Sequence, residues 1–197
     1  YTIEQALKSK YIDEICLSSD SIKIINIAKS FGLNVFFKRP KILSTDYALT
    51  KDVVKHALKK SKKYFKKKFD YFILLQPTCP LRKSFHIDQS IKKLISSKHN
   101  SLISICDVDG YHPNRMKVIK KNLLFNYSKK KSEDMRPRQK LPKVFIRNGA
   151  IYLTKVSFFE KKKVISDKTS IPYLMEQDNS INIDGPLDLE LAKILLS

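Results

Sequence analysis

Polar side chains that could bind a ligand follow three apolar segments of this sequence. They are the groups at residues 18–20 (Ser-Ser-Asp), at residues 76–82, and at the segment that ends in Asp184. If the apolar segments are strands of one open parallel sheet, their carboxyl ends meet at the edge where such sheets bind ligands. We therefore expect the three groups to form one site. Ser19 and Asp20 are, however, also typical helix caps.

The segment 76–82 is the most specific of the three groups. It directly follows the apolar run at residues 70–75, and Pro77 and Pro80 exclude regular structure there. A rigid loop at this place would present the Gln76 amide as a fixed hydrogen-bond donor and acceptor. An ordinary turn between a strand and a helix is the other interpretation of the same pattern.

The hydrophobic pattern predicts the elements that position these groups. We expect helices near residues 1–7, 22–31, 50–58, 87–95 and 186–195, and strands at residues 14–18, 35–37, 70–75, 102–105, 145–153 and 179–184. Alternation of this kind favours a three-layer α/β/α, Rossmann-like domain with a mostly parallel sheet. Between residues 111 and 142 the pattern weakens around a possible hairpin at Lys121 and Asn122, so this stretch is expected to leave the sheet.

Composition excludes several classes of protein. The 197 residues suffice for one domain with a core, and a hydrophobic content of 42% excludes a disordered chain. No apolar run approaches the roughly 20 residues needed to span a bilayer, and no signal peptide is visible. The three cysteines are far apart and form no CxxC pair, so neither a disulfide scaffold nor a structural zinc site is expected. A reducing, cytoplasmic setting fits best.

The chain is strongly basic, with 39 Lys and Arg against 19 Asp and Glu, a formal charge of +20. Its lysines gather at residues 59–68, 129–131 and 161–163. One interpretation is a nucleic-acid-binding surface, and the other is a set of solvated helix ends and loops. We favour the second and expect no nucleic-acid partner, because no nucleic-acid-binding motif accompanies the charge. The positive field would still favour small anionic substrates.

Five ordered segments of the chain carry a family resemblance. They are residues 74–82 (LLQPTCPLR), 38–46 (KRPKILSTD), 136–142 (RPRQKLP), 148–152 (NGAIY) and 180–188 (SINIDGPLD). Together they resemble the acylneuraminate cytidylyltransferases, which include the CMP-sialic acid synthetases and their bacterial relatives for legionaminic and pseudaminic acids. The motifs do not separate these three sugars, and a related branch that activates Kdo fits the segment 136–152 less well.

The resemblance implies an activity and a set of partners. An enzyme of this family joins CMP from CTP to an acidic nine-carbon sugar and releases pyrophosphate, with Mg²⁺ as cofactor, for surface glycan biosynthesis. The anomeric hydroxyl attacks the α-phosphorus in line, with no covalent enzyme intermediate. The resemblance also implies a homodimer in which an arm at residues 111–142 reaches toward the neighbouring subunit and completes its sugar pocket.

Roles for individual residues follow from the same resemblance. It places Arg39, Ala48 and Thr50 at the cytidine, Gln76 at the sugar, Arg115 and Arg138 near the sugar acid, Tyr152 in the pocket wall, and Asp184 at the metal. Arg138 and Asp184 are thereby the expected catalytic residues. Arginine can grip a carboxylate with two parallel N–H bonds, and a carboxylate is the hard oxygen ligand that Mg²⁺ takes.

For Asp184, and for the two further candidates Asn148 and His112, a second interpretation stays open. Asp184 is also placed to cap the last helix. Asn148 is a substrate-binding candidate by its place near the pocket, but its type also suits the turn before Gly149. His112 is a conceivable proton acceptor, although beside Pro113 it is more typical of a loop residue.

The sequence departs from the family at three places. The family begins with a strand and a Gly- and basic-rich phosphate loop, whereas Tyr1 corresponds to the helix after them. We therefore expect one nucleotidyltransferase domain over residues 1–197 that lacks this strand and loop, and either further residues upstream or an inactive chain. The alternative function is a noncatalytic relative that acts as a binding or assembly module.

The other two departures are single residues. Asn182 stands where the family has an aspartate, which predicts weaker Mg²⁺ binding, and Cys79 replaces a serine, which predicts sensitivity to thiol reagents.

Overall fold

The computed structural model of the chain describes residues 1–128 and 134–197, so the lysines at 129–131 lie outside the described residues. Its α-helices are α1 (Thr2–Leu7), α2 (Ile22–Ser30), α3 (Thr50–Phe65), α4 (Ser84–Ile95), α5 (Val156–Lys162) and α6 (Pro186–Leu196). Its strands are β1 (Tyr71–Leu74), β2 (Ser101–Asp107), β3 (Lys117–Lys120), β4 (Leu123–Asn126), β5 (Phe145–Lys155) and β6 (Ile171–Leu174). Short 3₁₀ turns lie at η1 (Lys41–Leu43), η2 (Pro113–Arg115), η3 (Arg138–Lys140) and η4 (Gln177–Asn179).

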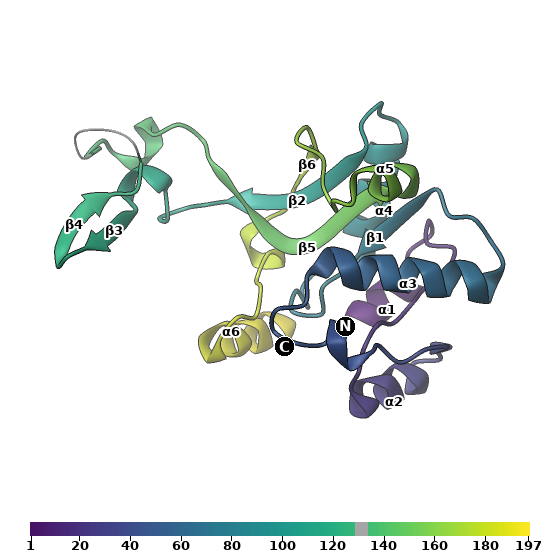
Figure 1. Cartoon of the computed structure of the whole chain (residues 1–197). Coiled ribbons are helices and arrows are strands. Elements are labelled where there is room, and N and C mark those ends of the chain that lie inside the picture. Colours follow the sequence, from purple (N-terminus) through teal and green to yellow (C-terminus); the bar gives the residue numbers. More distant parts are fainter. Residues whose placement is uncertain (129–133) are drawn as a thin grey trace.

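The main sheet has the strand order β1-β5-β2-β6 (Figure 1). Strands β1, β2 and β6 run in one direction, because β5 is antiparallel to both β1 and β2 and β6 is parallel to β2. The long strand β5 places Tyr152 opposite Leu74 and Phe145 opposite Asp107. Strand β5 therefore lies between β1 and β2 and pairs with the last residue of each.

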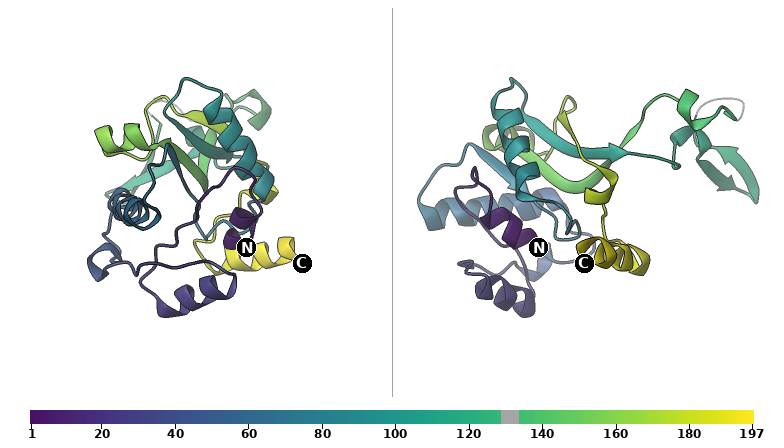
Figure 2. Two further views of the ribbon diagram at one scale, coloured as in Figure 1. Left: turned by 90° about the vertical axis from the view of Figure 1, so that its right-hand side faces the viewer. Right: turned by 180° about the vertical axis from the view of Figure 1, so that it is seen from behind.

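Helices cover both faces of this sheet (Figure 2). Helices α3 and α5 lie on one face, where Lys62 Nζ of α3 donates to Glu160 Oε1 of α5 at 2.7 Å. Helix α4 lies on the other face and buries Ile87, Ile91 and Leu94 in the core of the domain. The expected three-layer α/β/α domain is confirmed. Its sheet is mixed rather than mostly parallel, because β5 pairs antiparallel with both β1 and β2 and only β2 and β6 pair in parallel.

Three of the expected strands are wrong. Residues 14–18, 35–37 and 179–184 form no strand in the described structure. A strand needs a neighbour that offers a ladder of N–H and C=O groups. Near the first two stretches the described residues show instead one backbone bond just beyond their ends, from Arg39 N to Ser19 O at 2.9 Å. The third stretch makes one backbone bond of this kind to a distant segment of the described chain, from Ile183 N to Thr78 O at 2.8 Å.

Strand β6 and helix α5 were not expected from the sequence. Pro172 interrupts the strand pattern of β6, and it is tolerated because β6 lies at the edge of the sheet.

Residues 111–128 and 134–142 leave the domain as an arm that carries the β3–β4 hairpin (Figure 1). Lys121 and Asn122 form its turn with φ of +49° and +63°, as a two-residue hairpin turn requires. Bonds from Val108 N to Val144 O at 3.3 Å and between His112 Nε2 and Pro142 O at 3.0 Å close the base of the arm. The expected excursion and its hairpin are confirmed for the described part of this range.

Within residues 1–128 and 134–197, none of the helices combines the length and the apolar character that crossing a membrane requires.

Candidate functional site

The loop that carries Gln76 begins directly after β1. Its first turn closes with a bond from Cys79 N to Gln76 O at 3.3 Å, and Thr78 O accepts the bond from Ile183 N. Tyr152, half-buried on β5, stands opposite Leu74 and so lies beside the start of the loop. Two of the three expected polar groups, at residues 76–82 and at the segment ending in Asp184, therefore meet at one place.

Gly149 makes room for the Gln76 side chain. A Cβ atom at Gly149 would lie 2.8 Å from Gln76 Oε1, 3.3 Å from Cys79 Sγ and 3.5 Å from Asn182 Oδ1. Its φ of +78° is also a conformation that favours glycine. The side chains of Gln76, Cys79 and Asn182 thus converge on this glycine of β5, and we call this set, together with Asp184, the Gln76 cluster.

Asp184 carries the negative charge of the cluster and is exposed. Its Oδ2 accepts a bond from Asn182 Nδ2 at 2.7 Å. The expectation that Asp184 caps the last helix is wrong, because Asp188 does so: Asp188 Oδ2 accepts from Asp184 N at 3.0 Å and from Gly185 N at 2.8 Å.

Asn148 is buried beneath the cluster and joins three segments. Its Oδ1 accepts from Ser104 Oγ at 2.6 Å and from Ala150 N at 3.2 Å, and its Nδ2 donates to Ser180 Oγ at 2.9 Å. The amide therefore sets the turn of β5 before Gly149 and fastens residues 179–184 to it. Its expected contact with substrate stays a prediction.

The residues expected at the nucleotide lie between residues 39 and 50. Arg39 donates from Nε to Ser44 Oγ at 2.9 Å and pairs with Asp20 at 3.4 Å. Ala48 N donates to Thr45 O at 3.0 Å, and the exposed Thr50 is the first residue of α3. Helix α3 begins on the side of the sheet where β1 ends (Figure 1). Asp20, in the third expected polar group, is thus a partner of Arg39, while Ser21 caps α2.

Arg115 and Arg138 lie at the base of the arm and not in the Gln76 cluster of the same chain. Arg138 forms an ion pair with Asp109, and Arg115 donates from Nη2 to Arg136 O at 3.4 Å. Both precede β5, whose first residue, Phe145, stands opposite Asp107, whereas Gly149 lies further along the strand. The four expected residues Gln76, Asp184, Arg115 and Arg138 therefore form two groups within one chain.

Comparison with known proteins adds to these observations. The family described as Cytidylyltransferase matches residues 1–196. The chain belongs to the cytidylyltransferase family. The cytidylyltransferase is 30% identical to the post-translational flagellin modification protein B of Campylobacter coli, over all of this chain and 82% of that protein. It is 29% identical to a pseudaminic acid cytidylyltransferase of Campylobacter jejuni, over 99% of this chain and 83% of that protein.

Other relatives are longer or more distant. The N-acylneuraminate cytidylyltransferase of Escherichia coli is 31% identical over 98% of this chain, which spans only 44% of that protein. The solved structure of CMP:2-keto-3-deoxy-manno-octonic acid synthetase complexed with CTP has the same fold, with a TM-score of 0.66 at 13% identity, over 98% of this chain and 85% of that one. By its family, this cytidylyltransferase is an enzyme of the nucleotidyltransferase type.

The cluster fits a magnesium ion that is shared with a substrate. Within the described ranges no group of three His, Cys, Asp or Glu residues could hold a metal by itself. Mg²⁺ commonly takes one or two carboxylates together with substrate phosphates and waters. The exposed Asp184 carboxylate matches the protein part of that donor set, whereas Asn182 turns its Nδ2 toward Asp184 and its Oδ1 toward Cys79 Sγ.

Two chemical expectations for the cytidylyltransferase are not supported by the geometry. Cys79 is 1% exposed, and burial raises the pKa of its thiol, so the reactive thiolate is disfavoured in the folded state. The expected sensitivity to thiol reagents stays a prediction. His112 is buried, with Nε2 at Pro142 O and Nδ1 accepting from Asn114 N at 3.1 Å. Both ring nitrogens are engaged in the arm, which supports the interpretation of His112 as a loop residue.

The sequence pattern does not single out two arginines that the structure places here. Arg82, the last residue of the segment 74–82, is 1% exposed and lies beneath the loop. Arg147 is exposed on β5, two residues before Gly149, which makes it the arginine closest to the cluster along β5. Its place immediately before the NGAIY segment was the available signal.

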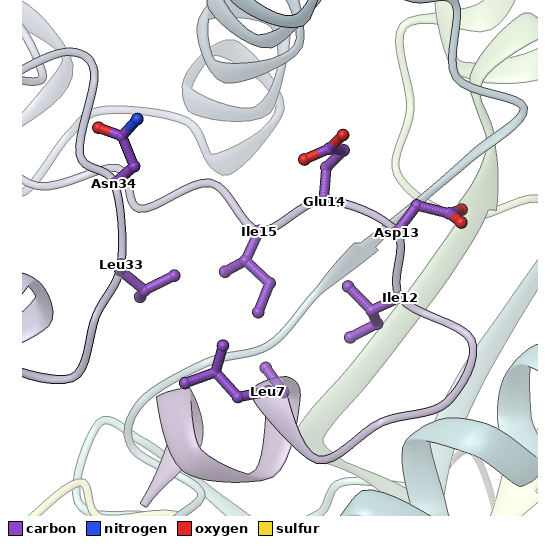
Figure 3. A pocket seen from close by; sticks show the side chains of 8 residues that line it. Leu7, Ile12, Asp13, Glu14, Ile15, Leu33 and Asn34 are labelled. Atoms are coloured by element: carbon purple, nitrogen blue, oxygen red, sulfur yellow. The ribbon is translucent and has the colours of Figure 1, made fainter.

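A separate hollow lies away from these residues (Figure 3). It has a volume of about 260 Å³ and is lined mainly by apolar side chains of α1 and the following extended segments, among them Leu7, Ile12 and Leu33. None of its lining residues belongs to the Gln76 cluster.

Proposed function

We propose that this cytidylyltransferase transfers CMP from CTP to an acidic nonulosonic sugar, such as sialic, legionaminic or pseudaminic acid, and releases pyrophosphate. The observation that carries the proposal is the convergence of Gln76, Gly149 and the Asn182–Asp184 pair at the end of β1. The names of the bacterial relatives, which include pseudaminic acid and N-acylneuraminate cytidylyltransferases, support this choice of sugar class.

The sugar would bind against the loop. The Gln76 amide offers one acceptor and two donors to sugar hydroxyls, and it is held in place by the space over Gly149. Tyr152 would form a wall of this pocket. The exposed Arg147, two residues before Gly149 on β5, would add a cation that suits the carboxylate of the sugar.

The nucleotide would bind across the carboxyl edge of the sheet, beside the segment that carries Arg39, Ala48 and Thr50. Asp184 would hold Mg²⁺ together with phosphate oxygens and water. When bound, this ion neutralises charge on the triphosphate and on the departing pyrophosphate. The formal charge of +20 favours the approach of both anionic substrates.

The reaction is an in-line displacement. The anomeric oxygen of the sugar forms a bond to the α-phosphorus of CTP, the bond from that phosphorus to the bridging oxygen breaks, and pyrophosphate leaves with its electron pair. The hydroxyl proton passes to solvent. Catalysis would rest on positioning and on charge neutralisation.

We also propose that the arm serves a second copy of the chain. The hairpin exposes large apolar side chains, with Ile119 75% exposed and Leu124 65% exposed. Arg115 and Arg138 at its base are separated from the Gln76 cluster of their own chain, so a neighbouring subunit's cluster is the place where they could meet a sugar acid. Static light scattering should show a dimer, and a monomer at all concentrations would contradict this arrangement.

The experiment that tests the activity is pyrophosphate release from the protein expressed from its complete gene, with the four nucleoside triphosphates and a panel of nonulosonic acids. We expect release with CTP and at least one of these sugars, and none with the other nucleotides. Kdo in the same panel is the control for the related sugar class. Binding of CTP without turnover of any sugar would instead favour a noncatalytic binding or assembly module.

A further inference from the structure

Arg82 is a buried cation without an acidic partner among the described residues. Its side chain is 1% exposed, and none of the ion pairs in the described parts of the chain includes it. Its Nε atom is buried without a hydrogen-bond partner there. Loss of hydration lowers the pKa of the guanidinium to about 10, which leaves it charged at neutral pH.

The guanidinium hydrogen-bonds to three segments that are far apart in the sequence. Its Nη1 donates to Ala150 O at 2.8 Å and to Gln76 O at 3.2 Å, and its Nη2 donates to Thr2 Oγ1 at 2.8 Å. Ala150 follows Gly149, which makes the space for the Gln76 side chain. One planar group therefore fixes the backbone of Gln76 and the backbone beside the glycine on which Gln76 rests.

We propose that Arg82 is a positioning residue that holds the Gln76 amide in its binding orientation. This inference rests on the proposed function for its link to catalysis. It assigns Arg82 no contact with substrate, because the side chain is covered by the loop that it holds.

The type of side chain supports a positioning role. Burying a charge without a counter-charge is costly, and an apolar side chain of similar size would fill the same space more cheaply. Arginine can donate in a fixed fork to acceptors on several segments at once, whereas lysine is a point charge on a flexible stem. This energetically unfavourable buried charge lies where the Gln76 loop, β5 and α1 meet, and it donates a hydrogen bond to each of them.

A native reporter makes the inference testable without any substrate. Cys79 lies in the same loop and is 1% exposed, while Cys106 lies in β2 and is 6% exposed. If Arg82 holds the loop, Arg82→Lys should speed alkylation of Cys79 by iodoacetamide about 10-fold or more and that of Cys106 less than about 2-fold, because only the loop opens. Mass spectrometry of the labelled peptides separates the two rates.

The matched control is Arg136→Lys, since Arg136 makes a bidentate pair with Asp134 in the arm. It should leave Cys79 labelling unchanged. Equal acceleration at Cys79 and Cys106, or none at either, would overturn the proposal. Should Arg82→Lys not fold, Thr2→Val removes only the hydroxyl acceptor and should speed Cys79 labelling to a smaller extent, with Cys106 again unchanged.

A second measurement connects the loop to the sugar. We expect Arg82→Lys to lower kcat/KM for the sugar about 10-fold, but less than about 2-fold in a Gln76→Ala background, because the two changes act through one group. KM for CTP should stay within a factor of about 2. Multiplicative losses in the double variant would show that Arg82 does not act through Gln76. If the unmodified protein releases no pyrophosphate, the proposed function fails, while the labelling pattern still decides whether Arg82 holds the loop.

Discussion

At the scale of single residues, the Gln76 side chain has its space because Gly149 has no side chain. In Gly149→Ala the new Cβ would meet Gln76 Oε1 at 2.8 Å and would sit at a φ of +78°. We expect a loss of stability of about 1–2 kcal/mol from the left-handed backbone. The flexible end of Gln76 gives way at the same time, so kcat/KM for the sugar should fall about 10-fold or more.

Gly110→Ala is the control for this substitution, because a Cβ there meets no atom within 4 Å. Urea unfolding and steady-state kinetics on both variants give the comparison. A Gly149→Ala enzyme with normal sugar kinetics would show that Gln76 does not need its observed position.

Asn182 lies beside Asp184, the residue that we propose to hold Mg²⁺. In Asn182→Asp a second carboxylate would stand where Nδ2 now donates to Asp184 Oδ2 at 2.7 Å. Two carboxylates at that distance repel each other unless a cation lies between them. We therefore expect the variant to be less stable in the presence of a chelator, to gain stability on addition of Mg²⁺, and to reach half-maximal rate at a lower Mg²⁺ concentration.

Thermal melts with and without Mg²⁺ and a metal titration of the rate measure these effects. The unmodified protein should melt at nearly the same temperature in both conditions. An unchanged metal titration in Asn182→Asp would argue against a metal at Asp184.

At the scale of the elements, we expect the start of α4 to make the stability of the fold depend on pH. Burial, with Arg82 and Lys83 as nearby cations, lowers the pKa of His86 to about 4. Its Nδ1 accepts a bond from Lys83 N at 3.0 Å, which protonation would break. Because the unfolded chain binds this proton near pH 6.5 and the folded chain does not, the free energy of unfolding should fall as the pH drops from about 6.5 to about 4, by at most about 3 kcal/mol.

Urea unfolding across this pH range checks the expectation. His86→Gln keeps an acceptor near Lys83 N but does not titrate, so its stability should fall less over the same range. Parallel pH profiles for the two proteins would assign the acid sensitivity to other groups.

The elements also show what local sequence can reveal. Hydrophobic periodicity predicts β2, β5, α3 and the hairpin turn at Lys121, because each depends on residues close in the sequence. The segments at 14–18, 35–37 and 179–184 are as apolar as strands, but strand formation depends on a distant neighbour that their own residues do not reveal. The opposite error occurs at β6, where Pro172 interrupts the local pattern although the segment forms a strand.

In the candidate site, too, the sequence indicates some features and leaves others unpredicted. The motif at residues 74–82 indicates Gln76, and the meeting of its loop with the segment before Asp184 follows from the rule for sheet edges. The contact from Arg82 to Thr2, which are separated by 80 positions, leaves no trace in either local pattern. The sequence also does not show that Arg138 lies apart from Gln76, because the order of motifs along a chain does not give the distance between them.

At the scale of the whole molecule, the arm decides whether one chain can build a complete sugar site. If the arm's arginines serve a neighbouring subunit, Gln76→Ala and Arg138→Ala damage different halves of the same composite site. Each homodimer should be nearly inactive. A mixture of the two should regain activity, because a mixed dimer with one variant of each kind contains one site with both an intact Gln76 and an intact Arg138. For equal, freely exchanging subunits we expect about a quarter of the normal rate.

Subunits are exchanged by mixing and warming before pyrophosphate release is measured, and light scattering confirms the dimer in each sample. Mixing Gln76→Ala with Asp184→Asn is the control, since both residues belong to the same Gln76 cluster. In that mixed dimer each site carries one defect, Gln76→Ala in the cluster of one chain and Asp184→Asn in the cluster of the other. Because Gln76 and Asp184 of one site come from one chain, the control mixture should stay inactive. Recovery in the control, or none with Arg138→Ala, would place Arg138 with the cluster of its own chain or outside the site.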